Sequence, residues 1–226
     1  MYLKSTIYSF VPIVYNYAMK VIALIADIID LKDIPDRKDF QNELAACLDE
    51  INKASQTIVS PYTITLGDGF QAVYDAGDEI IDHILHILVK FFPVQVRFSI
   101  SYDALYTDIN RERAIGMDGP VFHAAREGMN ELKPTRYSIV RVSGCAGDRS
   151  EILNTGMRLV FSIMSGWKKD TLRMFYDLYQ GKKVKDILHD YNLSQRGVYK
   201  LISRNKIREF VDYFNGVRME LEKLKG

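Results

Sequence analysis

The stretch VIALIAD (residues 21–27) is an apolar run that ends at a carboxylate. A run of this kind is typical of a buried strand that reaches the surface at its last residue. The turn Gly67-Asp68-Gly69 separates two further strand-like stretches, 62–66 and 70–74. A second carboxylate is therefore expected at the tip of a hairpin.

Hydrophobic periodicity orders the neighbouring elements around this strand and hairpin. The predicted order is a strand over 20–29, a helix over 39–54, the hairpin, a helix over 77–91 and a strand over 94–102. This is the βαββαβ order of ferredoxin-like folds. In the antiparallel sheet usual for that order, the end of the first strand lies beside the hairpin tip. Asp27 and Asp68 would then be neighbours.

Two carboxylates at adjacent strand ends suit a hard cation. Proteins usually hold Mg²⁺ with one or two carboxylates together with substrate phosphates. We therefore predict Mg²⁺ or Mn²⁺ at Asp27 and Asp68. The alternative is purely local, with Asp27 capping the start of a helix and Asp68 serving only its turn. The sequence leaves both interpretations open.

The chain then continues with a helix that has Pro120 in its first turn, a strand over 137–142 and a helix over 149–165. We place a domain boundary at Gly166. The predicted fold class is α+β, with an N-terminal appendage over 1–18, a ferredoxin-like domain over 19–166 and an all-α domain over 167–226. The uncharged part of the appendage is too short to span a bilayer, so no membrane partner is expected.

The segment after residue 166 has the pattern of a helix-turn-helix unit. A helix is followed by a short second helix, a turn over 192–194 and a third helix, for which Ser194 is a suitable N-cap. Side chains that suit base edges and phosphates lie on the exposed face of the third helix: Gln195, Arg196, Tyr199, Lys200 and Arg204. The alternative is a small helical bundle with a solvated basic face.

The distribution of charge supports a polyanionic partner such as duplex DNA. Residues 182–208 contain eight Lys or Arg and two Asp, which gives 8 − 2 = +6, whereas the whole chain has a net charge of +1. Basic residues are thus concentrated in the predicted helix-turn-helix. Two cysteines are too few for a disulfide framework or a zinc site, and a reducing, cytoplasmic location is expected.

The last helix has a heptad-like seam of apolar residues at alternating intervals of three and four. Its members are Ile207, Phe210, Phe214, Val217, Leu221 and Leu224. The seam either packs within the chain, which we favour, or pairs with a second copy in a homodimer.

Four blocks of sequence carry a family resemblance. IALIADIIDLKDIPDR, ITLGDGFQAVYD, VRFSISYD and AIGMDGPVFHAARE together resemble the SatD family over residues 20–165. The helix-turn-helix tail also suits SatD-like proteins. The same blocks are more distantly similar to class III nucleotide cyclases, whose ferredoxin-like core uses two metal-binding aspartates.

The cyclase resemblance implies roles for individual residues. Asp27 and Asp68 match the two metal-binding aspartates, the Ile28 carbonyl could assist the metal, and Arg126 stands where a cyclase has its transition-state arginine. The basic residues nearest in sequence to the implied phosphate site are Lys32 and Arg37. Each of these three cations has a plain alternative as a solvated surface charge.

The chain departs from the cyclase pattern at several positions. Phe122 replaces an expected asparagine, Ile64 replaces a base-reading lysine, and Asp30-Leu31-Lys32 replaces the usual Gly-Phe-Thr. These departures favour a DNA-binding regulator whose N-terminal domain senses a nucleotide. The alternative is a two-metal nucleotidyl cyclase or nucleotidyltransferase that uses the tail only for assembly. Whether the protein is an enzyme is undecided by the sequence.

Overall fold

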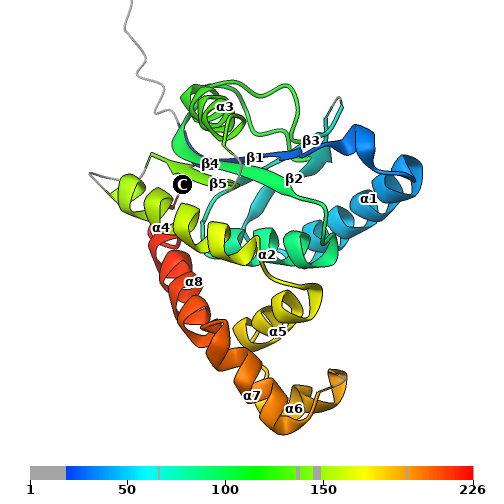
Figure 1. The fold of residues 1–226 in the computed structure, drawn as a ribbon. Coiled ribbons are helices and arrows are strands. Elements are labelled where there is room, and N and C mark those ends of the chain that lie inside the picture. Colours follow the sequence, from blue (N-terminus) through cyan, green and yellow to red (C-terminus); the bar gives the residue numbers. More distant parts are fainter. Residues whose placement is uncertain (1–18, 66, 136–137, 145–148, 192, 226) are drawn as a thin grey trace, which may run out of the picture.

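The computed structural model describes residues 19–65, 67–135, 138–144, 149–191 and 193–225. These residues form a mixed α+β fold in which one five-stranded sheet has helices on both faces (Figure 1). The predicted appendage over 1–18 lies outside the described residues. Within the described ranges, no helix is both long and apolar enough to cross a bilayer.

The central strand of the sheet is β1 (Met19–Ile28), the buried strand that the apolar run predicts. The strand order is β2-β3-β1-β4-β5. β1 pairs antiparallel with both β3 (Gly69–Tyr74) and β4 (Val96–Leu105), and β2 (Ile58–Ile64) pairs antiparallel with β3. β5 (Val140–Ser143) joins β4 in parallel.

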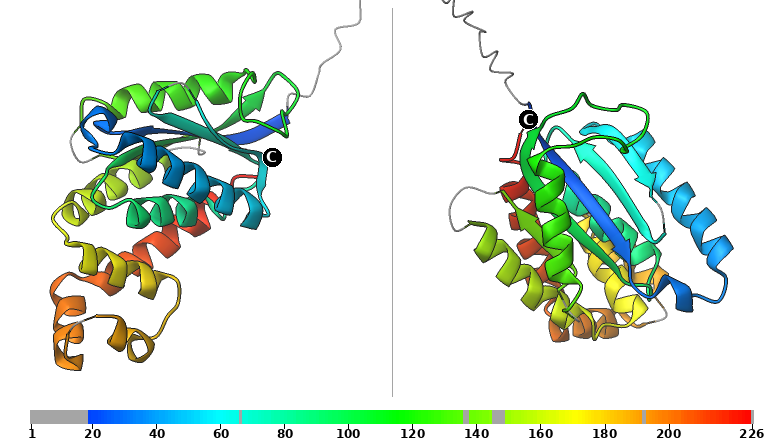
Figure 2. Two further views of the ribbon diagram at one scale, coloured as in Figure 1. Left: turned by 90° about the vertical axis from the view of Figure 1, so that its right-hand side faces the viewer. Right: turned by 90° about the horizontal axis from the view of Figure 1, so that it is seen from above.

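Alternate residues of β1 supply two different cores. Ile22, Leu24, Ala26 and Ile28 belong to the larger core, together with buried residues of α1 (Arg37–Ala54), α2 (Ile80–Lys90) and α4 (Arg149–Met164). Val21 and Ala23 belong to a smaller core beneath α3 (Pro120–Leu132). Figure 2 shows α3 alone across one face of the sheet and the other helices across the opposite face. Asp27 lies on the same face of β1 as Val21 and Ala23, which is the face that α3 covers.

The predicted elements are present, with bounds that shift by a few residues. The strand expected over 94–102 is β4, which runs from Val96 to Leu105. The helix expected over 77–91 is α2, which begins later, at Ile80. The helix expected to begin near Pro120 is α3, and four residues at helical spacing form its buried stripe: Phe122, Ala125, Met129 and Leu132.

The C-terminal segment contains α5 (Lys169–Tyr179), the short α6 (Val184–Ile187), a 3₁₀ helix (Leu188–Asp190), α7 (Gln195–Arg204) and α8 (Ile207–Leu221). This tail extends from the sheet layer, and α8 returns to it (Figure 1). The apolar seam of α8 is buried within the chain, which confirms the favoured interpretation. The core is continuous across Gly166, because the seam joins the same cluster as Ile22 and Leu24.

Polar contacts also fix the tail against the sheet layer. Tyr179 donates a hydrogen bond to the Asp82 carboxylate, and the Tyr176 hydroxyl lies 3.0 Å from Nδ1 of His86. At the other end, the Gly77 amide donates to the Leu224 carbonyl at 3.2 Å. A Cβ at Gly77 would lie 2.2 Å from the Leu221 carbonyl oxygen, so only glycine permits this close approach.

Candidate functional site

The end of β1 and the tip of the β2–β3 hairpin meet at one edge of the sheet. Asp27 lies opposite Gly69 in the β1–β3 register. One residue further, the Ile28 amide donates a hydrogen bond to the Asp68 carbonyl at 3.0 Å. The structure therefore brings the two predicted carboxylates together, although they are 41 positions apart in sequence (68 − 27).

The two carboxylates repel each other. Burial raises the pKa of the Asp27 carboxyl above its ordinary value, and the negative charge of Asp68 raises it further. A hydrogen bond from Arg97 opposes this rise. A divalent cation would relieve the repulsion, and carboxylate oxygens are the ligands that Mg²⁺ and Mn²⁺ prefer. The donor set therefore fits such an ion.

Arg97 is a member of this edge that the sequence did not predict. It lies directly opposite Asp27 in the β1–β4 register, and its Nη1 is 3.2 Å from Oδ2 of Asp27. Its Nη2 donates to the carbonyl of Lys133, just after the end of α3, at 3.4 Å. In the alternating stretch VRFSISYD, Arg97 lies on the opposite face of the strand from the buried residues Val96 and Phe98. The pattern therefore identifies it only as a polar residue of a strand. Only the strand register reveals its partner.

The connection between β1 and α1 places basic residues beside Asp68. Asp30 adopts a left-handed conformation (φ 54°), and a 3₁₀ helix over Leu31–Asp33 then turns the chain back. The result is an open depression beside the hairpin tip. It is lined by Asp30, Leu31, Lys32, Arg37, Gly67 and Asp68. Both cations predicted to contact phosphate therefore share a surface with one of the predicted metal ligands.

Arg126 occupies a different place. Its exposed guanidinium lies over the Phe122 ring, 6.0 Å from the ring centroid. The part of α3 that approaches Asp27 is its C-terminal end at Lys133, roughly 10 Å further along the helix axis at 1.5 Å per residue. The contacts of the described residues do not connect Arg126 with the carboxylate edge. Its predicted role at the phosphates stays a prediction.

The described residues of the edge do not form a complete metal site from acidic, His or Cys side chains alone. Among the residues that the structure describes, no group of three or more His, Cys, Asp or Glu side chains could hold a metal ion. His83 and His86 instead face tyrosine hydroxyls in the interior. Two carboxylates with neighbouring cations therefore suit a metal that arrives with a phosphorylated ligand.

The second candidate site is α7, whose local structure is as predicted. The Ser194 hydroxyl accepts a hydrogen bond from the Gly197 amide at 3.2 Å and so caps the helix. Val198 and Ile202 are buried beneath it. The predicted contact residues are all exposed: Gln195, Arg196, Tyr199, Lys200 and Arg204.

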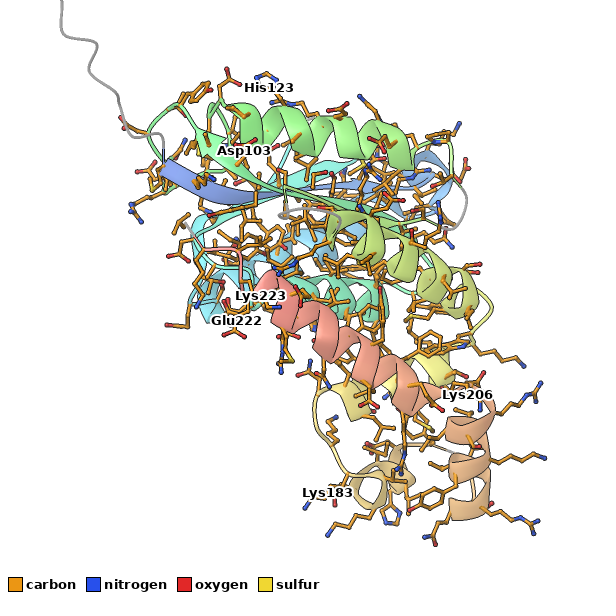
Figure 3. All side chains as sticks on the ribbon, turned by 90° about the vertical axis from the view of Figure 1, so that its left-hand side faces the viewer. Asp103, His123, Lys183, Lys206, Glu222 and Lys223 are labelled. Atoms are coloured by element: carbon orange, nitrogen blue, oxygen red, sulfur yellow. The ribbon has the colours of Figure 1, made fainter. Side chains whose placement is uncertain are left out.

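Basic residues lie on the exposed face of α7 and also line the grooves on either side of it. One flanking groove is lined in part by Lys168, Lys200 and Arg204. The other is lined in part by Lys182, Lys183, Lys185, Tyr199 and Arg208. Figure 3 shows Lys183 and Lys206 on the tail, far from Asp103 and His123 on the sheet domain. Among the described residues, no ion pair engages Arg196, Lys200 or Arg204.

Comparison with known proteins gives one family. The SatD family model matches residues 21–206, a span that includes the carboxylate edge and the whole of α7. No curated protein matches the chain.

Proposed function

Because this chain belongs to the SatD family, whose match spans both candidate sites, we propose that the two sites serve one function. The protein is a DNA-binding regulator whose N-terminal domain binds a divalent cation and a nucleotide. One observation carries this proposal. A carboxylate edge flanked by Lys32 and Arg37 shares a continuous core with an exposed basic helix.

The topology supports a ferredoxin-like, cyclase-like N-terminal domain. The order β2-β3-β1-β4, with every neighbouring pair antiparallel, is the arrangement expected of a βαββαβ unit. β5 extends it by one parallel strand. The tail, with Ser194 capping α7 after a short helix and turn, supports a helix-turn-helix assignment.

The residues of the edge have separate tasks in this proposal. Asp27 and Asp68 hold Mg²⁺ or Mn²⁺, which neutralises phosphate charge when bound. Lys32 and Arg37 contact the phosphates from the depression beside Asp68. Phe122 is a fully buried residue of α3, and its side chain has no amide to offer a ligand. The absence of that amide favours sensing over catalysis.

The first experiment tests the cation site. We expect calorimetry to show Mn²⁺ binding to the full chain and Asp68→Asn to abolish it, because one of two carboxylate ligands is lost. ATP or GTP should then raise the melting temperature only when Mn²⁺ is present, since a ligand that binds the folded state stabilises it. Asp33→Asn is the matched control, because Asp33 is exposed in the same connection and does not line the depression. Unchanged Mn²⁺ affinity in Asp68→Asn would refute the metal site.

The second experiment tests DNA binding by α7. We expect affinity for duplex DNA to fall with salt, at a slope of roughly −0.9 per phosphate contact. Arg204→Ala should weaken binding to every sequence and flatten that slope by about one unit. Arg196→Ala, near the N-terminal end of α7, should instead reduce discrimination between sequences.

The control for these substitutions is Arg158→Ala, which removes an exposed arginine from α4. It should leave the salt slope unchanged. If the folded full chain shows no salt-dependent binding to any duplex, α7 is a solvated basic face and an assembly role for the tail is favoured.

The retained carboxylates also support a second function, that of a two-metal nucleotidyl cyclase or nucleotidyltransferase. Incubation of the pure protein with each nucleoside triphosphate and Mg²⁺ or Mn²⁺ tests it. A new nucleotide product that Asp27→Asn eliminates would favour the enzyme over the sensor.

A further inference from the structure

We infer that Arg97 is an internal counter-ion of Asp27 that a divalent cation must displace, so that Arg97 sets the metal affinity of the carboxylate edge. This inference rests on the proposed metal site and adds a regulating residue to it. In the metal-free protein, the Arg97 guanidinium is hydrogen-bonded to Asp27, one of the two proposed metal ligands.

The geometry places Arg97 and the cation in competition for the same oxygen atoms. Arg97 and Asp27 face each other across β4 and β1, with Nη1 and Oδ2 3.2 Å apart. Their side chains are only 15% and 17% exposed, so water screens the pair weakly. A metal that binds Asp27 must therefore break a charge-assisted hydrogen bond in a partly dry environment.

The pair is nevertheless built to separate. Only one nitrogen of Arg97 bonds Asp27, whereas the strongest arginine–carboxylate pairs use two parallel hydrogen bonds. A second nitrogen is already held by the Lys133 carbonyl, and the buried Nε has no partner among the described residues. Arg97 can thus leave Asp27 and keep a contact at the end of α3.

The charges at the edge also favour competition between Arg97 and the cation. Without a metal, Arg97 balances the buried negative charge of Asp27 beside Asp68. When a divalent cation binds, the positive charge of Arg97 opposes it at short range, and this repulsion weakens binding. A ligand that supplies negative charge together with the cation, as a nucleotide phosphate does, then strengthens the binding of the cation.

Arg97→Gln tests the competition, because glutamine removes the charge and keeps a polar side chain. At pH 8 we expect calorimetry to show that Arg97→Gln binds Mn²⁺ about tenfold tighter than the unaltered chain, since no charge-assisted hydrogen bond must be broken. Arg97→Lys, which keeps the charge, should restore the original affinity. Arg141→Gln is the matched control. Arg141 lies on β5, the strand next to β4, and forms an ion pair at 2.6 Å with Glu131 of α3, not with Asp27 or Asp68.

A second readout separates competition from a purely structural role. Without metal, Arg97→Gln should melt at a lower temperature, because Asp27 loses its partner. Saturating Mn²⁺ should raise the melting temperature of Arg97→Gln more than that of the unaltered chain. A merely structural arginine would lower both melting temperatures equally and leave Mn²⁺ affinity unchanged.

The outcomes distinguish this inference from the proposed function. Equal Mn²⁺ affinity in the unaltered chain and Arg97→Gln overturns the counter-ion role and leaves the metal site standing. Tighter binding in Arg141→Gln as well would show a general charge effect and overturn the inference. If neither the unaltered chain nor Arg97→Gln binds Mn²⁺, both the inference and the metal site fail.

Discussion

Phe214→Ala is expected to lower the free energy of unfolding by about 3–5 kcal/mol, the usual cost of replacing a buried phenylalanine with alanine. Phe214 is fully buried at the centre of an aromatic group formed where the tail packs against α4. Its ring centroid lies 5.6 Å from that of Phe161, 5.4 Å from that of Phe175 and 5.4 Å from that of Tyr213. Removal leaves a cavity between α4, α5 and α8, and rigid rings cannot collapse to fill it.

Denaturant unfolding followed by circular dichroism measures this loss. Met219→Ala is the control on the same helix, since Met219 is 63% exposed and its truncation should change stability by no more than about 0.5 kcal/mol. A loss below about 1 kcal/mol for Phe214→Ala would contradict the packing described here.

The same variant tests whether the tail is an independent domain. Trp167 is the sole tryptophan and packs on Phe210 and Phe175 in the tail, with centroid distances of 4.8 and 5.8 Å. Its fluorescence reports the tail, whereas circular dichroism reports the whole chain. Because one apolar core crosses Gly166, we expect the two transitions to coincide in the unaltered chain and in Phe214→Ala. An earlier fluorescence transition would show that the tail unfolds by itself.

His83→Gln is expected to flatten the dependence of stability on pH. The pKa of His83 is lowered from 6.5 to about 4, chiefly because the imidazole is buried; the charge of Glu79 raises this pKa and that of His86 lowers it. Nδ1 of His83 lies 2.9 Å from the Tyr74 hydroxyl, and the Tyr62 ring packs edge-on against the imidazole. The folded protein therefore holds a neutral imidazole at pH values where the unfolded chain is already protonated.

The sign of the effect follows from this difference. Between pH 6.5 and 4 the unfolded chain binds a proton that the folded chain does not, so stability falls as the pH falls through this window. From pH 7 to pH 5, His83 alone should cost about 2 kcal/mol. His83→Gln should remove that part of the slope, as measured by denaturant unfolding at each pH.

His123→Gln is the matched control, because His123 is 66% exposed and lies 3.3 Å from Asp118 on the surface of α3. It should leave the slope between pH 7 and pH 5 nearly unchanged. If His83→Gln keeps the full slope of the unaltered chain, other groups cause the loss and the imidazole is not buried as described.

The sequence predicted one half of the carboxylate edge and missed the other. Asp27 and Asp68 were found because apolar runs that end at acidic residues mark strand ends, which is a local signal. Arg97 was missed because its role depends on standing opposite Asp27, 70 positions earlier in the chain (97 − 27). Lys32 and Arg37 were chosen for nearness in sequence, and a left-handed residue at Asp30 brings them to Asp68.

The predicted boundary at Gly166 likewise rests on a local signal and misses contacts between distant segments. A change in composition after residue 166 suggested a separate helical domain, and the tail does form its own run of helices. The prediction could not reveal that α8 returns to α2 and joins the main core. Contacts such as that of Gly77 with Leu221 depend on distant segments, which leave no periodicity in the sequence.

By itself the sequence determined which segments are strands and helices, where carboxylates end strands, and where basic residues gather, because periods of 2 and 3.6 and charge are properties of neighbouring residues. The tertiary structure alone decided the strand register that pairs Arg97 with Asp27, the distance of Arg126 from the edge, and the fixing of the tail on α2. These depend on packing and pairing between segments that only the folded chain brings together.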